Sequence, residues 1–225
     1  RSVTPSEIEG GELARYRMLV VPGGWAPNYI RDLEGAGERA IREFVRDGGS
    51  YLGICAGAYY ACDHVIWEVE RYEYTLKLFA GAAVGPIPEI APWPKFALGE
   101  IVLEQAWGQR RGAGESGSAF YFGGPYFEPS NAAEATVLAR FRANGKPAAV
   151  RTTFGHGQVV LISPHLEIDP KEPWPETPGM LETLASAKSL RPLLETVIGD
   201  LLKKGTAVDM QQAPNGSSQE EKNLK

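Results

Sequence analysis

The chain has 225 residues, 43% of them hydrophobic, and its 23 basic and 28 acidic side chains leave a formal net charge of −5. This composition excludes a wholly disordered protein, and the acidic balance without a Lys/Arg-rich run argues against a nucleic-acid binder. Two cysteines are too few for a disulfide framework, and no apolar run approaches the roughly 18 to 20 residues that span a bilayer. We therefore expect a compact cytoplasmic domain that contacts neither nucleic acid nor membrane.

The first part of the chain predicts a βαβ unit. Residues 18–21 are a short apolar run closed by Pro and Gly, as in a buried strand. Residues 31–47 carry apolar side chains at helical spacing with charged residues between them, which predicts an amphipathic helix that ends at Gly48-Gly49. A second buried strand follows at residues 51–54. The two strands should run parallel, joined by a right-handed crossover.

From residue 78 onward, the sequence predicts short strands and then a helix. Clusters of Gly, Pro, Asn or Ser separate β-prone segments at residues 78–85, 98–104, 118–122, 135–141, 147–154 and 158–163, with a hairpin turn at 154–158. A proline-rich loop covers residues 169–179, and a leucine stripe at residues 187–204 predicts a helix. Residues 205–225 lack a periodic apolar face. We therefore predict one domain over residues 1–204 and a disordered tail over residues 205–225.

One junction in the βαβ unit has the pattern of a catalytic nucleophile. In Gly53-Ile54-Cys55-Ala56-Gly57, a cysteine stands between the second strand and a small-residue stretch suited to a helix start. Glycine on either side leaves room for a crowded turn, as in the G-x-S-x-G elbow of serine hydrolases, and the helix N-terminus would favour the reactive thiolate. The alternative is a small buried hydrophobic residue at a tight turn. The pentapeptide alone leaves both interpretations open.

Two further segments fall at the same edge of the predicted sheet. Gly23 and Gly24 end the first strand, and the amide of Gly24 together with that of Ala56 could form an oxyanion hole. A double glycine also occurs in plain tight turns. His165 follows the last of the predicted strands and could act as base for the cysteine, with Glu167 orienting its imidazole. A lone histidine there would be a structural residue, but the three pieces together predict a Cys-His-Glu triad.

With these motifs, the sequence resembles the class I glutamine amidotransferase-like superfamily. More narrowly, it is similar to the domain at the N-terminus of eukaryotic biotin–protein ligases and in stand-alone microbial proteins. The resemblance covers residues 15–204 and is carried by residues 41–45, 49–60, 121–125 and 163–167. It implies a flavodoxin-like three-layer sandwich, an α/β fold with a mostly parallel sheet and added β-hairpin segments. It also implies Cys55 as nucleophile, His165 as base and Glu167 as the orienting residue.

The sequence departs from the pattern of this family in several places. Tyr59 stands four residues after the nucleophile, where glutamine-hydrolysing members carry Gln, and Leu166 replaces the proline of their His-Pro-Glu segment. Glutaminase activity is therefore not expected. The fold should also open with a strand and a helix that residues 1–17 are too short and too polar to supply. We expect a truncated or processed chain, or a rearranged sheet.

Aromatic residues near the predicted site favour a pocket for a small-molecule substrate or ligand. Candidates for its lining are Gly23, Trp25, Tyr59, Gly124 and Tyr126. Cys62 lies about two helical turns beyond Cys55, too far for a disulfide, and is interpreted as a packing residue. The pattern predicts no metal site and no cofactor.

These observations leave two functional hypotheses. The first is a thiol-dependent hydrolase or transferase that acts on an unidentified amide or ester. The second is a catalytically silent ligand-binding or regulatory module that keeps the turn around Cys55 for structural reasons. Tyr59 favours the silent module, whereas the intact set of Cys55, His165 and Glu167 opposes it. A homodimer, or a partner domain upstream of Arg1, is compatible with either.

Overall fold

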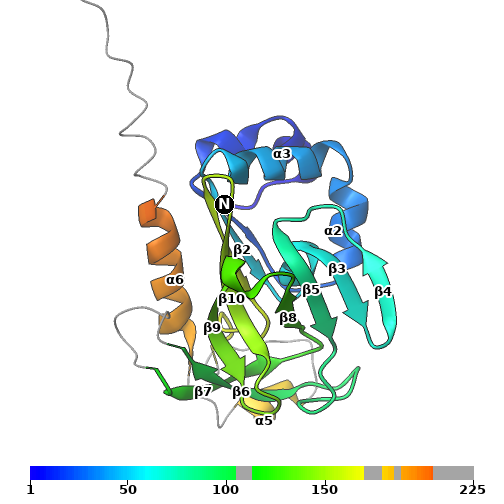
Figure 1. Cartoon of the computed structure of the whole chain (residues 1–225), viewed down its shortest axis with the longest axis vertical. Helices are drawn as coiled ribbons and strands as arrows, with labels where there is room; N and C mark the ends of the chain where they lie inside the picture. Colours follow the sequence, from blue (N-terminus) through cyan, green and yellow to red (C-terminus); the bar gives the residue numbers. More distant parts are fainter. Residues whose placement is uncertain (105–112, 170–178, 185–188, 205–225) are drawn as a thin grey trace, which may run out of the picture.

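Two β-sheets, the larger one covered by helices, make up the described part of the chain (Figure 1). The computed structural model describes residues 1–104, 113–169, 179–184 and 189–204. The predicted tail and residues 170–178 of the predicted proline-rich loop lie outside this part of the chain. Within the described residues, no helix has both the length and the apolar character that crossing a membrane requires.

Helices and strands alternate in the first part of the chain, and strands dominate its middle. The helical segments are α1 (Pro5–Glu9), η1 (Glu12–Arg15), α2 (Ala26–Leu33), α3 (Ala36–Arg46), α4 (Ala56–Tyr60), η2 (Ala132–Glu134), α5 (Met180–Leu184) and α6 (Arg191–Lys204). The strands are β1 (Met18–Val21), β2 (Ser50–Ile54), β3 (Cys62–Trp67), β4 (Glu70–Glu73), β5 (Phe79–Gly85), β6 (Ala97–Leu103), β7 (Ser116–Tyr121), β8 (Tyr126–Pro129), β9 (Thr136–Phe141), β10 (Pro147–Phe154) and β11 (Gly157–Ile162). Every strand predicted from the sequence is present.

The larger sheet has the predicted parallel pairing at one end only. Its strand order is β1-β2-β11-β10-β9-β6-β7. β1 pairs parallel with β2 and β2 with β11, whereas the pairs from β11 through β7 are all antiparallel. The fold class is therefore α/β as predicted, but the sheet is mixed rather than mostly parallel. The reason is that antiparallel strands joined by hairpins, such as β10 and β11, extend it beyond the parallel unit.

A helical crossover joins β1 to β2, as the βαβ pattern predicts. It consists of two helices, because α2 ends at Leu33 and Gly35 adopts a φ of +78°, which favours glycine, before α3 begins. α2 begins directly after Trp25 and has Pro27 in its first turn, where a missing N–H costs no helical hydrogen bond. The helix predicted over residues 31–47 therefore starts too late and omits this break.

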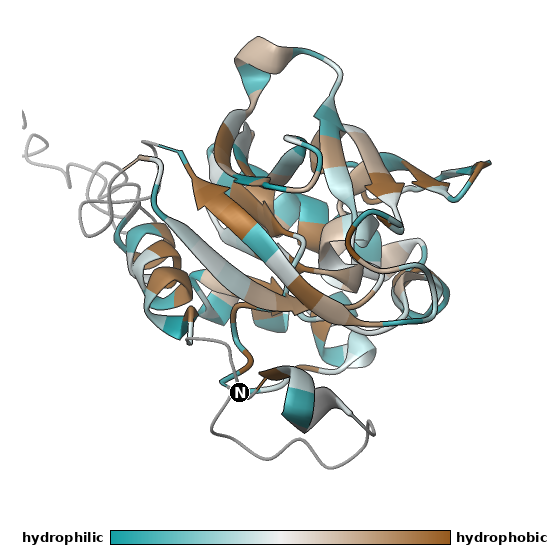
Figure 2. Ribbon diagram, turned by 90° about the horizontal axis from the view of Figure 1, so that it is seen from below, coloured by the Kyte–Doolittle hydropathy of each residue, from teal (hydrophilic) through white to brown (hydrophobic). Residues whose placement is uncertain are grey.

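The larger sheet lies between two helical layers, which is the predicted three-layer arrangement. Neighbouring side chains of β2 point to opposite faces: Tyr51 packs in the cluster that contains Ile41 of α3, and Leu52 in the cluster that contains Leu193 of α6. The hydroxyl of Ser50 donates to the carbonyl of Leu201 at 3.2 Å and ties α6 to the sheet. Figure 1 shows α3 and α6 at separate sides of β2, and Figure 2 shows apolar residues along the central strands.

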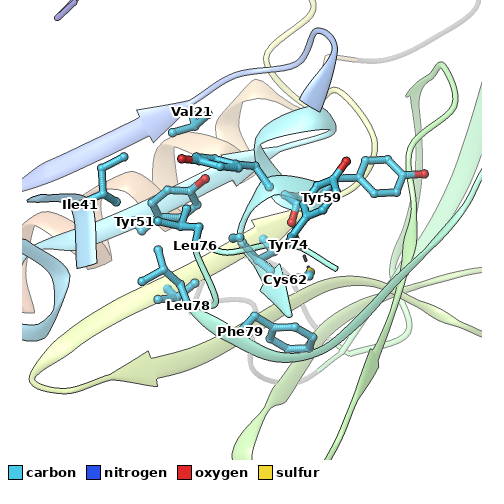
Figure 3. Packing of buried hydrophobic residues seen from close by; sticks show 14 of the residues in the cluster. Val21, Ile41, Tyr51, Tyr59, Cys62, Tyr74, Leu76, Leu78 and Phe79 are labelled. Atoms are coloured by element: carbon cyan, nitrogen blue, oxygen red, sulfur yellow. Dashed lines mark hydrogen bonds between the residues drawn. The ribbon is translucent and has the colours of Figure 1, made fainter. Parts of the chain in front are cut away.

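A second, four-stranded sheet has the order β4-β3-β5-β8, with β3 parallel to β5. The sequence predicts only β5 among these strands. The expectation that Cys62 continues the helix after Cys55 is wrong, because α4 ends at Tyr60 and Cys62 begins β3. Figure 3 shows Cys62 among buried hydrophobic side chains that include Phe79. Its assignment to packing agrees with an exposed fraction of 0%.

The residues ahead of β1 form helical turns. α1 begins with a capping box between Thr4 and Glu7, and η1 follows it. β1 pairs with β2 along one side, and no strand within the described residues pairs with its other side. The segment ahead of β1 therefore adds a helix to the fold and no strand to the sheet.

Candidate active site

A strained turn places Cys55 between β2 and α4. Cys55 has a φ of 49° and a ψ of −105°, a backbone conformation that residues other than glycine rarely adopt. The flanking glycines are needed for space: a Cβ on Gly57 would lie 2.0 Å from the carbonyl oxygen of Val21, and one on Gly53 would lie 2.6 Å from that of Gly57. Backbone strain of this kind concentrates at functional sites, where the surrounding structure holds it in place.

His165 and Glu167 lie just beyond the end of β11. Nδ1 of His165 is 2.7 Å from Oε1 of Glu167, and the backbone N–H of His165 donates to the carbonyl of Phe120 at 2.8 Å. The imidazole lies against the backbone of Gly23, where an added Cβ would be 2.4 Å from Cε1 of the ring. Gly23 therefore leaves the space that the histidine ring occupies.

The interaction between Cys55 and His165 governs the charge of the site. Burial acts to lower the pKa of His165, but hydrogen bonds to Cys55 and Glu167, together with their negative charges, raise that pKa to about 10. The imidazole is therefore protonated at neutral pH and lies between a sulfur and a carboxylate.

Hydrogen bonds orient the loop after β1. The hydroxyl of Tyr29 lies 3.0 Å from the carbonyl oxygen of Pro22 and 3.1 Å from that of Gly23. Because a trans peptide points its N–H away from its C=O, the N–H of Gly24 faces away from Tyr29. The N–H of Ala56, the first residue of α4, has no backbone acceptor among the described residues. The Ala56 N–H, next to Cys55 at the start of α4, is therefore not used by the helix, and Gly24 lies in the lining of the same cleft as Cys55.

A cleft of about 1110 Å³ has Cys55, His165 and Glu167 in its lining. Such a volume accommodates a small organic molecule. Among the described residues, eight aromatic side chains also line the cleft: Trp25, Tyr59, Trp67, Tyr72, Tyr74, Trp93, Phe120 and Phe122.

The structure brings most of the predicted site residues to this one cleft and leaves two outside it. Those in the lining are Gly23, Gly24, Trp25, Cys55, Ala56, Tyr59, His165 and Glu167. Gly124 instead packs against the loop after β11, since a Cβ there would lie 2.6 Å from Oγ of Ser163. Tyr126 belongs to β8, and the ammonium of Lys146 lies 5.0 Å from the centre of its ring. Neither residue contributes to the lining.

Tyr59 is fixed in the wall of the cleft. Its hydroxyl donates to the carbonyl of Gly123 at 2.9 Å, and its ring centre lies 5.9 Å from that of Trp67. A Cβ on Gly85 would lie 2.0 Å from the hydroxyl oxygen, so Gly85 leaves the space that the phenol fills. Burial raises the pKa of Tyr59 well above its ordinary value, and the side chain stays neutral.

Sequence reasoning missed part of the lining. Trp67 and Tyr72 lie on β3 and β4, two strands that the sequence does not predict. Phe122 and Gly123 belong to the motif at residues 121–125, from which sequence reasoning assigned Gly124, and neither of these two, to the pocket. One sequence pattern could have indicated Phe122 and Gly123 as lining residues. Phe122-Gly123-Gly124 resembles Gly23-Gly24-Trp25, since both combine a glycine pair with an aromatic residue after a strand.

The remaining cysteine and histidines lie away from this chemistry. Cys62 is a free, buried thiol, and its Sγ lies 3.3 Å from the carbonyl oxygen of Ala58. His64 is part of β3, and His156 lies in the exposed turn between β10 and β11. Across the part of the chain that the structure describes, no three His, Cys, Asp or Glu side chains are grouped to hold a metal ion.

Comparison with known proteins identifies relatives of this chain. A family model described as "Biotin-protein ligase, N terminal" matches residues 13–196. An "Uncharacterized protein" of Chlamydia muridarum (strain MoPn / Nigg) is 34% identical over 163 residues, which cover 69% of this chain and 62% of that protein. The biotin–protein ligase of Schizosaccharomyces pombe is 27% identical over 167 residues, which cover 67% of this chain and 25% of the ligase. The chain thus spans less than two thirds of the length of either relative.

Solved structures show the same architecture. A glutamine amidotransferase has a TM-score of 0.56 at 18% identity, and the match covers 89% of this chain and 84% of that one. PurLQS from Thermotoga maritima has a TM-score of 0.55 at 15% identity, with 83% and 80% covered. At these identities the similarity concerns the fold alone. With its family model matching most of its length, the chain belongs to the biotin–protein ligase N-terminal domain family and has a glutamine amidotransferase-like fold.

Proposed function

We propose that the chain is a thiol-dependent hydrolase or transferase that acts on an amide or ester through Cys55, His165 and Glu167. One observation carries this proposal: a cysteine on a strained turn shares a cleft with a His165–Glu167 pair whose atoms are 2.7 Å apart. A nucleophile, a base in contact with it and a third group that orients the base are the parts that covalent catalysis needs.

The proposed reaction has two halves. In the first, the thiolate of Cys55 attacks the substrate carbonyl carbon, and the N–H groups of Gly24 and Ala56 donate to the oxygen that becomes negative. The imidazolium of His165 then gives its proton to the leaving amine or alcohol, and a thioester remains on Cys55. In the second half, neutral His165 takes a proton from water or an acceptor amine, which attacks the thioester and releases Cys55.

Glutamine is not the proposed substrate. Tyr59 stands where glutamine-hydrolysing relatives carry a substrate-holding Gln, and its hydroxyl is already hydrogen-bonded to Gly123. The ring of Tyr59 is buried and packs on Trp67, so the side chain fills that part of the wall instead of offering an amide to a ligand.

A silent ligand-binding module is the second candidate, and the same tyrosine favours it. In such a module Cys55 would be a small residue at a tight turn, and the cleft would hold a ligand without covalent chemistry. The two candidates differ in whether an acyl group can be transferred to the sulfur.

Acylation of Cys55 by p-nitrophenyl acetate tests the proposal. We expect a stoichiometric burst of p-nitrophenol and an acetyl adduct that peptide mapping assigns to Cys55. The burst rate should fall by about 100-fold in His165→Ala, because general acid–base catalysis of this kind contributes factors of that order. Gly199→Ala, an alteration in α6 away from the cleft, should keep the wild-type burst. Acetylation no faster than that of free cysteine would overturn the proposal and favour the silent module.

A further inference from the structure

Four aromatic side chains form a continuous surface on one side of the cleft. We call Trp25, Trp67, Trp93 and Phe122 the aromatic wall. The rings of Trp25 and Trp67 meet at 82° with centroids 5.6 Å apart, and those of Trp67 and Trp93 at 79° and 5.3 Å. The ring of Phe122 stacks on Trp93 at 5.0 Å. Four separate segments therefore contribute to one surface.

The aromatic wall is connected to the sulfur along two routes. The carbonyl oxygen of Phe122 lies 3.8 Å from Sγ of Cys55, so the residue whose ring belongs to the wall also touches the thiol. Trp25 directly follows the Gly23-Gly24 loop, which contacts the imidazole of His165. The wall and Cys55 therefore line the same cleft, so a group that lies on the wall can belong to a molecule that reaches the sulfur.

The backbone is shaped to hold the wall in position. Gly123 has a φ of +65°, and a Cβ on it would lie 2.9 Å from the ring of Trp93. Only a glycine both adopts this conformation readily and lets the indole pack on the backbone. The indole of Trp93 is thereby seated between Gly123, Trp67 and Phe122 while one part of it stays exposed.

The wall leaves large apolar surface uncovered. Trp25 is 49% exposed, Trp93 38% and Phe122 37%. Among the described residues, the exposed large hydrophobic side chains are Val20, Trp25, Val69, Tyr72, Trp93, Phe122 and Leu202, and four of these seven line this cleft. Exposed apolar area that is gathered in a concave site indicates a ligand surface, because burying it against a ligand is favourable by about 25 cal/mol per Å².

The charges in the cleft indicate a neutral guest. The described lining has two cationic side chains, and each has a carboxylate partner: Arg71 Nε lies 2.8 Å from Oε1 of Glu73, and His165 contacts Glu167. The described lining also has two carboxylates, those of Glu73 and Glu167, so its charges balance. A carboxylate or phosphate on the guest would meet no unpaired cation, so flat apolar groups are the better match for indole faces.

We infer that the aromatic wall binds a neutral, planar aromatic group carried on the acyl side of the substrate, next to the carbonyl that Cys55 attacks. This inference rests on the proposed function for the reaction, but the wall's preference for a ring can be measured without turnover.

Methanethiosulfonate reagents test the inference, because the thiolate attacks their sulfenyl sulfur, forms a mixed disulfide and releases methanesulfinate. The rates for the benzyl and methyl reagents at Cys55 are compared with the same rates for glutathione. We expect the benzyl-to-methyl ratio at Cys55 to exceed that of glutathione by at least about 10-fold, which corresponds to about 1.4 kcal/mol. Trp25→Ala and Trp93→Ala should lower the ratio. Leu202→Ala, which removes an equally exposed apolar side chain outside the cleft, should not.

Charged reagents separate the other outcomes. Preference for the trimethylammonium-ethyl reagent over the benzyl one would mean a cation site, and preference for the sulfonatoethyl reagent an anion site; either overturns the inference. A ratio equal to that of glutathione overturns it too. Failure of the proposed function gives a different result from failure of this inference. If the proposed function is wrong, the methyl reagent reacts with Cys55 at the same rate in wild type and in His165→Ala.

A binding measurement removes the dependence on the nucleophile. The Cys55→Ala variant retains the aromatic wall and should bind benzamide at least about 10-fold more tightly than acetamide in calorimetry. Equal affinity for the two amides would contradict the inference. So would a preference for benzamide that disappears when Leu202→Ala is added to the Cys55→Ala variant but persists when Trp93→Ala is added.

Discussion

The geometry of the site depends on three linked features. They are the backbone conformation of Cys55, the position of the His165 ring and the absence of a side chain at Gly23. Cys55 is held at a φ of 49° by close contacts of Gly53 and Gly57, and the imidazole fits only because Gly23 has no Cβ. At this scale the sequence was informative, because the glycines around Cys55 and the histidine after a strand are local patterns. The interaction of the imidazole with Gly23 is not local, and no spacing in the sequence indicates it.

The charge of His165 gives the first prediction. The Glu167 carboxylate and the Cys55 sulfur raise the pKa of His165 to about 10, while burial opposes them. Replacing Glu167 with Gln keeps a hydrogen-bond partner but removes a negative charge, so the pKa of His165 should fall by about 1 to 3 units. Titration of the imidazole signals by NMR, with His165→Gln to assign them, measures this shift.

A Glu7→Gln variant is the control for this titration, because Glu7 lies in α1 and interacts with Thr4 and Arg1. It should leave the midpoint of His165 unchanged. A wild-type midpoint near the ordinary value of about 6.5 would contradict the charged pair.

Gly23→Ala gives the second prediction. The new Cβ would overlap Cε1 of His165, so the imidazole must move away from Gly23 and leave its present position relative to Cys55. Misplacement of a catalytic group by about 1 Å costs on the order of 100-fold, and the burst with p-nitrophenyl acetate should slow accordingly. Gly199→Ala, whose Cβ meets nothing within 4 Å, is the matched control and should keep the wild-type rate. Equal burst rates in the two variants would show that Gly23 does not position the histidine.

At the scale of elements, strands with strong apolar patterns were predicted and exposed ones were not. β2 is buried along its whole length, and its sequence predicts a strand clearly. β4 is exposed at all of its residues, so nothing in Glu70–Glu73 alternates between core and solvent. The crossover was predicted as one helix because the periodicity around Gly35 does not reveal a positive φ. Turn conformation and pairing within an exposed hairpin are set by tertiary contacts.

Two glycine substitutions within helices should have opposite effects on stability. Alanine normally stabilises a helix relative to glycine by about 0.5–1 kcal/mol, so Gly199→Ala in α6 should raise the free energy of unfolding by that amount. Gly57→Ala in α4 should lower it by about 1–3 kcal/mol, because its Cβ would lie 2.0 Å from the carbonyl oxygen of Val21. Urea unfolding followed by circular dichroism measures both. Stabilisation by Gly57→Ala would mean that β1 and α4 are not in close contact.

At the scale of the whole molecule, the site lies where the two sheets and their loops converge. The Cys-His-Glu set follows strands of the larger sheet, and part of the aromatic wall comes from the smaller one. The placement of the first set could be predicted because Cys55 directly follows β2, and His165 and Glu167 lie shortly after β11, two strands that the sequence indicates clearly. Of the wall, only Trp25 was predicted to line the pocket, because Trp67, Trp93 and Phe122 are distant from it in sequence and only the fold brings the four together.

Stability and chemistry should separate along β2, because α6 is tied to its first residue, Ser50, whereas Cys55 follows its last. Leu201 of α6 is 1% exposed and packs on the face away from α3. Leu201→Ala should lower the free energy of unfolding by about 2–5 kcal/mol through loss of burial and creation of a cavity. The burst rate at a temperature well below the unfolding midpoint should stay at the wild-type value. A burst that falls in proportion to stability would indicate that the cleft is not preformed.

The central claim is that His165 activates Cys55, and the rate of Cys55 alkylation by iodoacetamide at pH 7 tests it most directly. Peptide mapping follows Cys55, and the buried Cys62 serves as an internal reference that should remain unlabelled in folded protein. We predict that wild-type Cys55 reacts at least about 10-fold faster than Cys55 in His165→Ala, because the imidazolium stabilises the thiolate. Equal rates in the two proteins, with the same dependence on pH, would contradict the account.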